Sequence, residues 1–176
     1  MRGSPFKSLP QASDRKEQES RKQIAPAILV YQRLSRQHDQ AKALEITRKV
    51  VIASGRAFLS TVLESLDIDH LSSLAPEQRE AYLRPLLDPI PNAIYSLQFD
   101  DQQRVYFTVQ ACHFAQLCTQ LKASELAPLF CEVDDYFFRH DLPQVDLERS
   151  TTIAHGGKQC PFVLSLNDNS KTTTDT

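Results

Sequence analysis

The chain has 176 residues, of which 41% are apolar and 24% are charged, which is ordinary usage for a globular domain with a core of its own. Its formal net charge of −2 gives no electrostatic reason to expect a nucleic-acid or membrane-surface partner. No apolar run approaches the roughly 18 residues that a membrane-spanning helix requires. We therefore expect one domain with neither nucleic acid nor membrane as a partner.

The two ends of the chain differ in composition from its middle. Residues 1–22 are rich in Ser, Pro, Gln and charged residues, and the last segment, 167–176, is polar. Such segments bury too little apolar surface to offset the entropy lost when they become ordered. We therefore predict a disordered leader over 1–22, a single domain over 23–166 and a flexible tail over 167–176.

Apolar residues recur at helical spacing through the first half of the domain. One such pattern begins near Ile24, and a longer one spans residues 40–66. Gly55 lies inside the longer pattern, where the missing side chain would permit a close crossing with another helix. A third helix is expected within 73–87, because Pro76 suits a first turn and further prolines close the segment.

The second half of the domain changes to alternating periodicity. The expected elements are strands at 94–99 and 104–109, helices at 112–121 and 124–140, and strands at 145–153 and 160–166. Alternation of apolar and polar residues is typical of strands with one buried face. The predicted fold class is therefore α+β, with a helical N-terminal half followed by a ββααββ antiparallel-sheet half.

The chain has four cysteines, and their spacing argues against a structural zinc site. They are Cys112, Cys118, Cys131 and Cys160. No CxxC pattern occurs among them, and the histidines show no ligand spacing, so we expect neither a metal nor another cofactor. Free thiols fit a reducing compartment, and we therefore expect a cytoplasmic protein.

Cys112 is a candidate nucleophile because it follows a predicted strand and opens a predicted helix. Unpaired N–H groups at a helix start stabilise negative charge and so favour a thiolate. The alternative is that Cys112 is a small apolar filler. Cys118 lies on a different side of the same helix, and we expect it in the core.

Asp134 is a candidate proton-transfer group. It lies on the same predicted helix as Cys131, at a spacing that lets the carboxyl and the thiol share a face. The helix is rich in bulky apolar residues, and a carboxyl among such residues has a raised pKa and can act as an acid or a base near neutrality. Asp135 is expected to be a solvated neighbour.

The last two predicted strands supply further candidates. Arg149 would anchor a carboxylate if it points inward, and its neighbour Glu148 would then point to the opposite face. His155 precedes two glycines and could reach a pocket as a proton shuttle, or simply be solvated. Gly156 and Gly157 lack the spacing of a phosphate-binding loop, so nucleotide binding is not expected.

Several of these segments together resemble a known family. The matching positions are Cys112, Glu125, Leu126, Cys131, Asp134, Arg149, Thr151, Ile153, Gly156, Cys160 and Phe162. In order and spacing they are similar to the L-2-amino-thiazoline-4-carboxylic acid hydrolase family, over roughly residues 94–166. The chain departs from the family pattern at Pro161, where the family has aspartate, and at Ser150, where it has threonine. These departures indicate a divergent member.

The resemblance implies a hydrolase that opens a small heterocycle at a C–N or C–S bond. The implied nucleophile is Cys112 or Cys160, and Asp134 or His155 would move protons. The implied substrate-binding residues are Arg149, which would hold a carboxylate, together with Glu148 and Cys131.

Two alternative functions remain open at this stage. A divergent member could be a cyclase, isomerase or lyase of small-molecule, secondary-metabolite biosynthesis that uses the same acid–base groups without water. The fold could also serve as a non-catalytic module that binds a small ligand. In each case the expected partner is a small molecule, and the sequence leaves homo-oligomer formation open.

Overall fold

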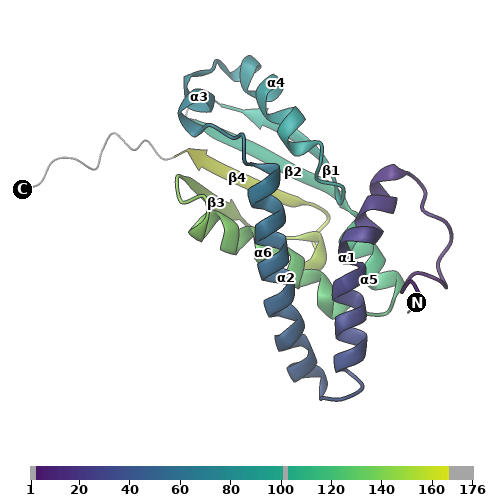
Figure 1. Ribbon diagram of the computed structural model, residues 1–176. Helices are drawn as coiled ribbons and strands as arrows, with labels where there is room; N and C mark the ends of the chain where they lie inside the picture. Colours follow the sequence, from purple (N-terminus) through teal and green to yellow (C-terminus); the bar gives the residue numbers. More distant parts are fainter. Residues whose placement is uncertain (1–2, 101–102, 167–176) are drawn as a thin grey trace, which may run out of the picture.

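The structure of the protein is a computed structural model that describes residues 3–100 and 103–166. Its helices are α1 (Arg15–Leu34), α2 (Gln40–Val62), α3 (Ile68–Ser73), α4 (Pro76–Leu87), α5 (His113–Gln120) and α6 (Ala127–His140), with short 3-10 helices η1 (Ser124–Leu126) and η2 (Ile153–His155). Its strands are β1 (Ala93–Phe99), β2 (Arg104–Cys112), β3 (Val145–Arg149) and β4 (Cys160–Leu166). Figure 1 shows the four helices α1–α4 preceding the sheet in the chain. The predicted α+β class and ββααββ order are confirmed.

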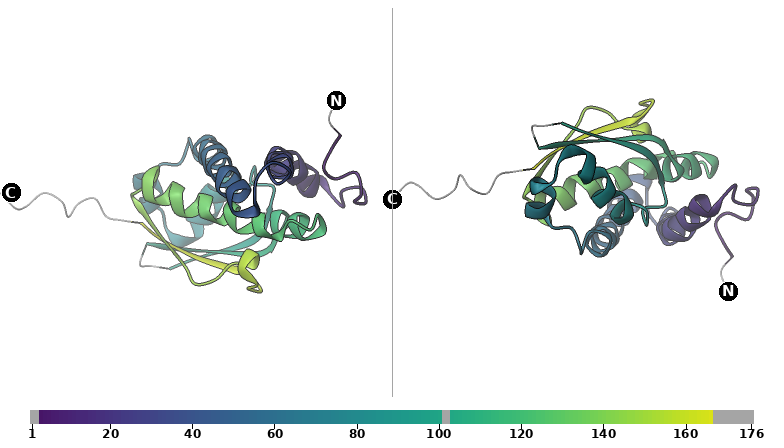
Figure 2. Two further views of the ribbon diagram at one scale, coloured as in Figure 1. Left: turned by 90° about the horizontal axis from the view of Figure 1, so that it is seen from below. Right: turned by 90° about the horizontal axis from the view of Figure 1, so that it is seen from above.

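The strands form one antiparallel sheet in the order β1-β2-β4-β3. Figure 2 shows the helices gathered on one face of this sheet. Side chains that point to this face are buried, and those on the other face include exposed Ile94, Gln98, Asp146 and Glu148. This is the one-sided burial that the alternating sequence pattern predicts for an antiparallel sheet.

The first helix begins earlier than the sequence analysis predicts. Asp14 accepts a hydrogen bond from the backbone N–H of Glu17 and thereby caps α1 at Arg15. Glu17 and Ser20 are buried against the rest of the protein. The expectation of a disordered leader is therefore corrected for residues 15–22, which belong to α1 and are held by contacts such as the hydrogen bond from Arg21 to Glu17.

The third predicted strand is also shorter than expected. It ends at Arg149, because Thr152 caps η2 by accepting a hydrogen bond from the backbone N–H of His155. Gly156 then adopts a φ of +88°, a left-handed conformation that glycine reaches without strain. The prediction of a strand that continues to residue 153 is therefore wrong. The predicted tail, 167–176, lies outside the described residues.

Helices α2 and α6 cross closely at Gly55, as its place in the sequence predicts. A β-carbon added to Gly55 would lie 2.6 and 2.7 Å from the two γ-methyl carbons of Val133, so α6 fills the space that a side chain would need. Within the described ranges, no helix is both long and apolar enough to cross a membrane.

The crossing generates a prediction about stability. Gly55→Ala should lower the free energy of unfolding by about 1–2 kcal/mol, because crowding against Val133 exceeds the gain of roughly 1 kcal/mol in helix propensity. In a Val133→Ala background the same substitution should raise stability, since the crowded methyl groups are gone. Urea unfolding of all four proteins would measure both effects. Stabilisation by Gly55→Ala in the wild-type background would contradict the close crossing.

Candidate active site

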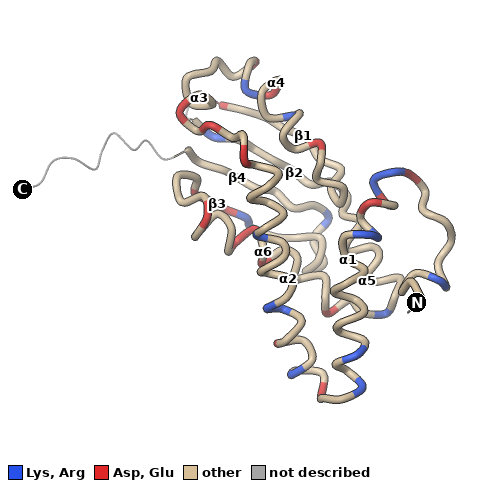
Figure 3. Tube along the Cα trace, viewed as in Figure 1, with Lys and Arg blue, Asp and Glu red and all other residues tan. Residues whose placement is uncertain are grey.

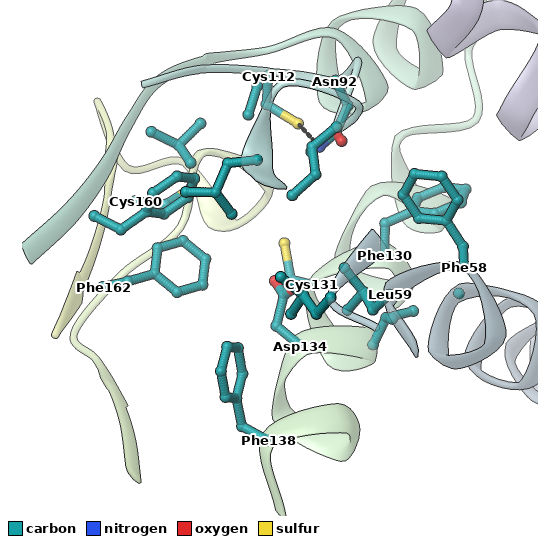
Figure 4. A pocket seen from close by; sticks show the side chains of 18 of the residues that line it. Phe58, Leu59, Asn92, Cys112, Phe130, Cys131, Asp134, Phe138, Cys160 and Phe162 are labelled. Atoms are coloured by element: carbon teal, nitrogen blue, oxygen red, sulfur yellow. Dashed lines mark hydrogen bonds between the residues drawn. The ribbon is translucent and has the colours of Figure 1, made fainter. Parts of the chain in front are cut away.

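The buried apolar residues form separate clusters with a cavity between them. One cluster joins α1, α2, α5 and α6, a second joins α3 and α4 to the sheet, and a third lies at the middle of the sheet. The cavity has a volume of about 390 Å³ and is lined by side chains from all three. Figure 4 shows Phe58 and Leu59 of α2 and Phe130 and Phe138 of α6 facing Phe162 of β4 across it.

The size of the cavity indicates a binding site. Protein interiors are close-packed and contain few voids larger than a water molecule. A space of about 390 Å³ between the core clusters is much larger than the voids that ordinary packing leaves. The volume also falls in the usual range of small-ligand pockets, so the cavity is the candidate site.

A bulge in the sheet turns Cys112 toward the cavity. In the pairing of β1 with β2, Tyr95 faces Val109 and Ile94 faces Ala111, so Gln110 is the additional residue. The bulge shifts the alternation by one position, and Cys112 therefore pairs with Ala93 on the helix-covered face. Without the extra residue, Cys112 would point to the open face of the sheet.

Cys112 also occupies the N-cap position of α5, as the sequence analysis predicts. Its side chain caps no backbone group, so the thiol is available to the cavity. The side-chain amide of Asn92 donates a hydrogen bond to the Cys112 sulfur over 3.9 Å, and the carbonyl of Asn92 accepts from His113 N–H. Figure 4 shows the sulfurs of Cys112 and Cys131 turned into the same space.

Asp134 lies on the opposite wall of the cavity and is held from behind by Arg149. Arg149 Nη1 donates to Asp134 Oδ2 over 3.1 Å, and Nη2 donates to the Cys131 carbonyl over 3.2 Å and to both carboxylate oxygens of Asp135. The Arg149 side chain is only 9% exposed, and its guanidinium lies 5.0 Å from the centre of the Phe162 ring. This geometry joins α6 to β3 and β4 beside the cavity.

The cavity environment raises the pKa of Asp134 to about 7. Loss of water around the carboxyl is the main cause, and the charge of Asp135 adds to it, while Arg149 acts in the opposite direction. The side chain keeps 28% exposure and lines the cavity. Asp134 can therefore exchange a proton with a bound molecule near neutral pH.

The other thiols are less suited to nucleophilic attack. Burial raises the pKa of Cys131 and of Cys118 to about 12, so both stay protonated near neutral pH. Cys118 is fully buried, which confirms the prediction that it belongs to the core. Burial also raises the pKa of Cys160, and its sulfur already accepts a hydrogen bond from the backbone N–H of Ile153.

Some sequence-predicted site residues lie away from the cavity. His155 is exposed, and its Nδ1 lies 2.7 Å from the hydroxyl oxygen of Thr152. Glu148 is exposed, and strand alternation places it on the open face of the sheet. Arg149 points inward but does not line the cavity, because its donors are directed at α6. The structure thus brings together Cys112, Cys131, Asp134 and Cys160, with Arg149 behind Asp134.

The sequence analysis missed polar residues that line the cavity, among them Ser54, Asn92 and Gln23. Asn92 follows a proline-rich turn and Gln23 lies on α1, and both line the cavity. Neither position carries a motif, so only the three-dimensional arrangement reveals them. Within 3–100 and 103–166, no group of three or more His, Cys, Asp or Glu side chains is placed to hold a metal ion.

The structure is an α+β fold in which helices cover one face of an antiparallel sheet, with a cavity between them. The family model described as L-2-amino-thiazoline-4-carboxylic acid hydrolase matches residues 17–164. The match covers most of the chain, and the chain therefore belongs to this family, as the resemblance over 94–166 predicts. No curated protein and no solved structure matches it.

The raised pKa of Asp134 predicts a specific pH dependence of stability. Because the folded state holds this proton up to about pH 7 and the unfolded state releases it near the ordinary pKa of about 4, stability due to Asp134 falls as the pH rises from about 4 to 7. The stability of Asp134→Asn relative to wild type should therefore improve between pH 5 and pH 8. Urea unfolding at both values would measure it.

Asp135→Asn provides the matched control for this experiment. It removes a carboxylate from the same guanidinium, but Asp135 does not line the cavity. An equal change with pH in the two variants would contradict the account, because it would assign the effect to the ion pairs with Arg149 rather than to the environment of Asp134.

Proposed function

We propose that the protein is a hydrolase that opens a small heterocycle at a C–N or C–S bond, with Cys112 as nucleophile and Asp134 as acid and base. Membership of the hydrolase family supports the reaction class. The observation that carries the assignment is that the Cys112 thiol and the Asp134 carboxyl enter one cavity from opposite walls. A thiol and a proton-transfer group that share a bound molecule are the minimum for covalent hydrolysis.

Cys112 is the preferred nucleophile on three grounds. It opens α5, where backbone N–H groups favour an anion, and the Asn92 amide donates to its sulfur. Cys131 is kept protonated by its surroundings, and the Cys160 sulfur is occupied by the N–H of Ile153. Of the two candidates that the sequence left open, Cys112 and Cys160, the proposal therefore takes Cys112 as the nucleophile.

The proposed reaction follows from these positions. The Cys112 thiolate adds to the carbon of a C=N bond in the ring, and the electron pair of that bond moves to nitrogen, which takes the proton of neutral Asp134. The ring C–N or C–S bond then breaks: its electron pair stays on the leaving ring atom, the nitrogen that remains on the carbon forms a C=N bond, and the proton that this nitrogen gives up goes to the leaving atom. A water molecule gives a proton to the Asp134 carboxylate and displaces the cysteine. The net change is the addition of one water molecule to the substrate.

In this proposal Arg149 is a positioning residue. Its guanidinium is engaged by Asp134, Asp135 and the Cys131 carbonyl, and it does not line the cavity. It therefore orients the acid rather than holding a substrate carboxylate. We assign no step to His155 or Glu148, because both are exposed outside the cavity.

The departure at Pro161 does not argue for a different reaction. Pro161 pairs with Thr108 and does not line the cavity, whereas its neighbours Cys160 and Phe162 do. Because successive strand side chains point to opposite faces, an aspartate at this position would also face away from the cavity. Hydrolysis is therefore preferred to the cyclase, isomerase or lyase alternatives.

The proposal predicts a product heavier than the substrate by one water. With a 2-amino-2-thiazoline as substrate, Cys112→Ser and Asp134→Asn should each lower kcat by roughly 100-fold or more. Cys118→Ala should leave kcat unchanged, since Cys118 lies outside the cavity. Mass spectrometry of the product and of the intact protein would measure turnover and locate a covalent adduct.

Two outcomes would overturn this proposal. A product of unchanged mass would indicate isomerisation or cyclisation on the same cavity. Binding without turnover, in a wild-type protein whose thiols react no faster than free cysteine, would indicate a non-catalytic binding module.

A further inference from the structure

The charged groups of the cavity are of one sign. Among the described residues that line it, Asp134 is the one with a formally charged side chain, and no Lys, Arg or His contributes. Figure 3 shows Lys and Arg at both ends of α1; at its start, Lys16 donates to the carbonyl of Ala93 in β1 over 3.4 Å but does not line the cavity. The nearby guanidinium of Arg149 is directed at Asp134 and Asp135. The lining residues within 3–100 and 103–166 thus offer no cation to a ligand carboxylate.

Side-chain oxygens at the cavity could accept hydrogen bonds from a bound molecule. The Gln23 side-chain oxygen Oε1 is buried and has no partner among the described residues, and Gln23 lines the cavity. Arg149 donates to only one oxygen of Asp134, Oδ2. Buried acceptors without a donor are costly, so a bound molecule with N–H groups would be stabilised here.

The remaining wall is apolar and partly aromatic. Phe58, Phe107, Phe130, Phe138 and Phe162 line the cavity, together with many aliphatic side chains. Removing a carboxylate from water into such surroundings without a cationic partner is strongly unfavourable. An apolar substituent gains free energy there, and a cationic head is attracted to ring faces and to a carboxylate.

We propose that this cavity takes a hydrophobic molecule with an amidine-type N–H donor head and no carboxylate. This inference rests on the proposed function, in which the same cavity is the reactive site, and it names the substrate class. The head would lie at Asp134, and the apolar body would lie between α2, α6 and the sheet. An amidinium beside an Asp134 carboxylate holds the same proton as an amidine beside the neutral acid, so binding leads directly into the proposed reaction.

Two probes that share the same heterocyclic ring test the inference. One is 2-amino-2-thiazoline with a benzyl group at position 4, and the other is 2-amino-2-thiazoline-4-carboxylate. Isothermal titration calorimetry with the full chain should show the benzyl probe binding at least about tenfold more tightly, a difference of roughly 1.4 kcal/mol. Asp134→Asn should weaken binding of the benzyl probe by about tenfold or more, because it removes the cavity's negative charge.

Asp146→Asn is the matched control for this titration. It also removes one negative charge, but Asp146 is exposed on the open face of the sheet and does not line the cavity. Its affinity for the benzyl probe should equal that of the wild type. Equal weakening in both variants would overturn the inference, because the net charge of the protein, rather than the Asp134 carboxylate in the cavity, would then determine the affinity.

Turnover of the two probes separates this inference from the proposed function. If the carboxylate probe binds as tightly as the benzyl probe, the inference is overturned whatever the turnover. If the carboxylate probe is hydrolysed with the higher kcat/KM, the inference is overturned while hydrolysis stands. If the benzyl probe binds preferentially through Asp134 and neither probe gains water, the inference holds as ligand selectivity and the hydrolase proposal fails.

Discussion

The guanidinium of Arg149 is the interaction on which the candidate site depends. It joins the last residue of β3 to one turn of α6 through Asp134, Asp135 and the Cys131 carbonyl, and it lies against Phe162 of β4. A nearly buried cation of this kind is tolerated because several acceptors surround it. The same contacts place the Asp134 carboxyl at the cavity wall, so one side chain both stabilises the fold and orients the acid.

The cavity exists because the helices do not close fully onto the sheet. Gly55 brings α2 against α6 so closely that these helices pack on each other, while the covered face of the sheet stays apart from them across the space between the core clusters. Filling that space would add stability, and leaving it open maintains a binding site. Because most of the lining residues are apolar, the cavity has low polarity, and this low polarity raises the pKa of Asp134.

The sequence predicted those features that depend on local periodicity. The strand pairs, α5 and α6, the helix start at Cys112, the close crossing at Gly55 and the enclosed carboxyl of Asp134 all follow from spacing and neighbours. Features that depend on pairing between distant segments were missed. The bulge at Gln110, which turns Cys112 inward, can be recognised only from the pairing register of β1 with β2. The engagement of Arg149 by α6 likewise requires the tertiary fold.

Titration of the Asp134 carboxyl tests the central claim most directly. Infrared difference spectra of the ligand-free protein, recorded between pH 3 and 9, would follow the C=O band of the protonated acid. The account predicts a band that disappears with a midpoint near pH 7, is missing in Asp134→Asn and persists in Asp135→Asn. A midpoint near the ordinary value of about 4 would contradict it, because Asp134 would then be an ionised surface partner of Arg149.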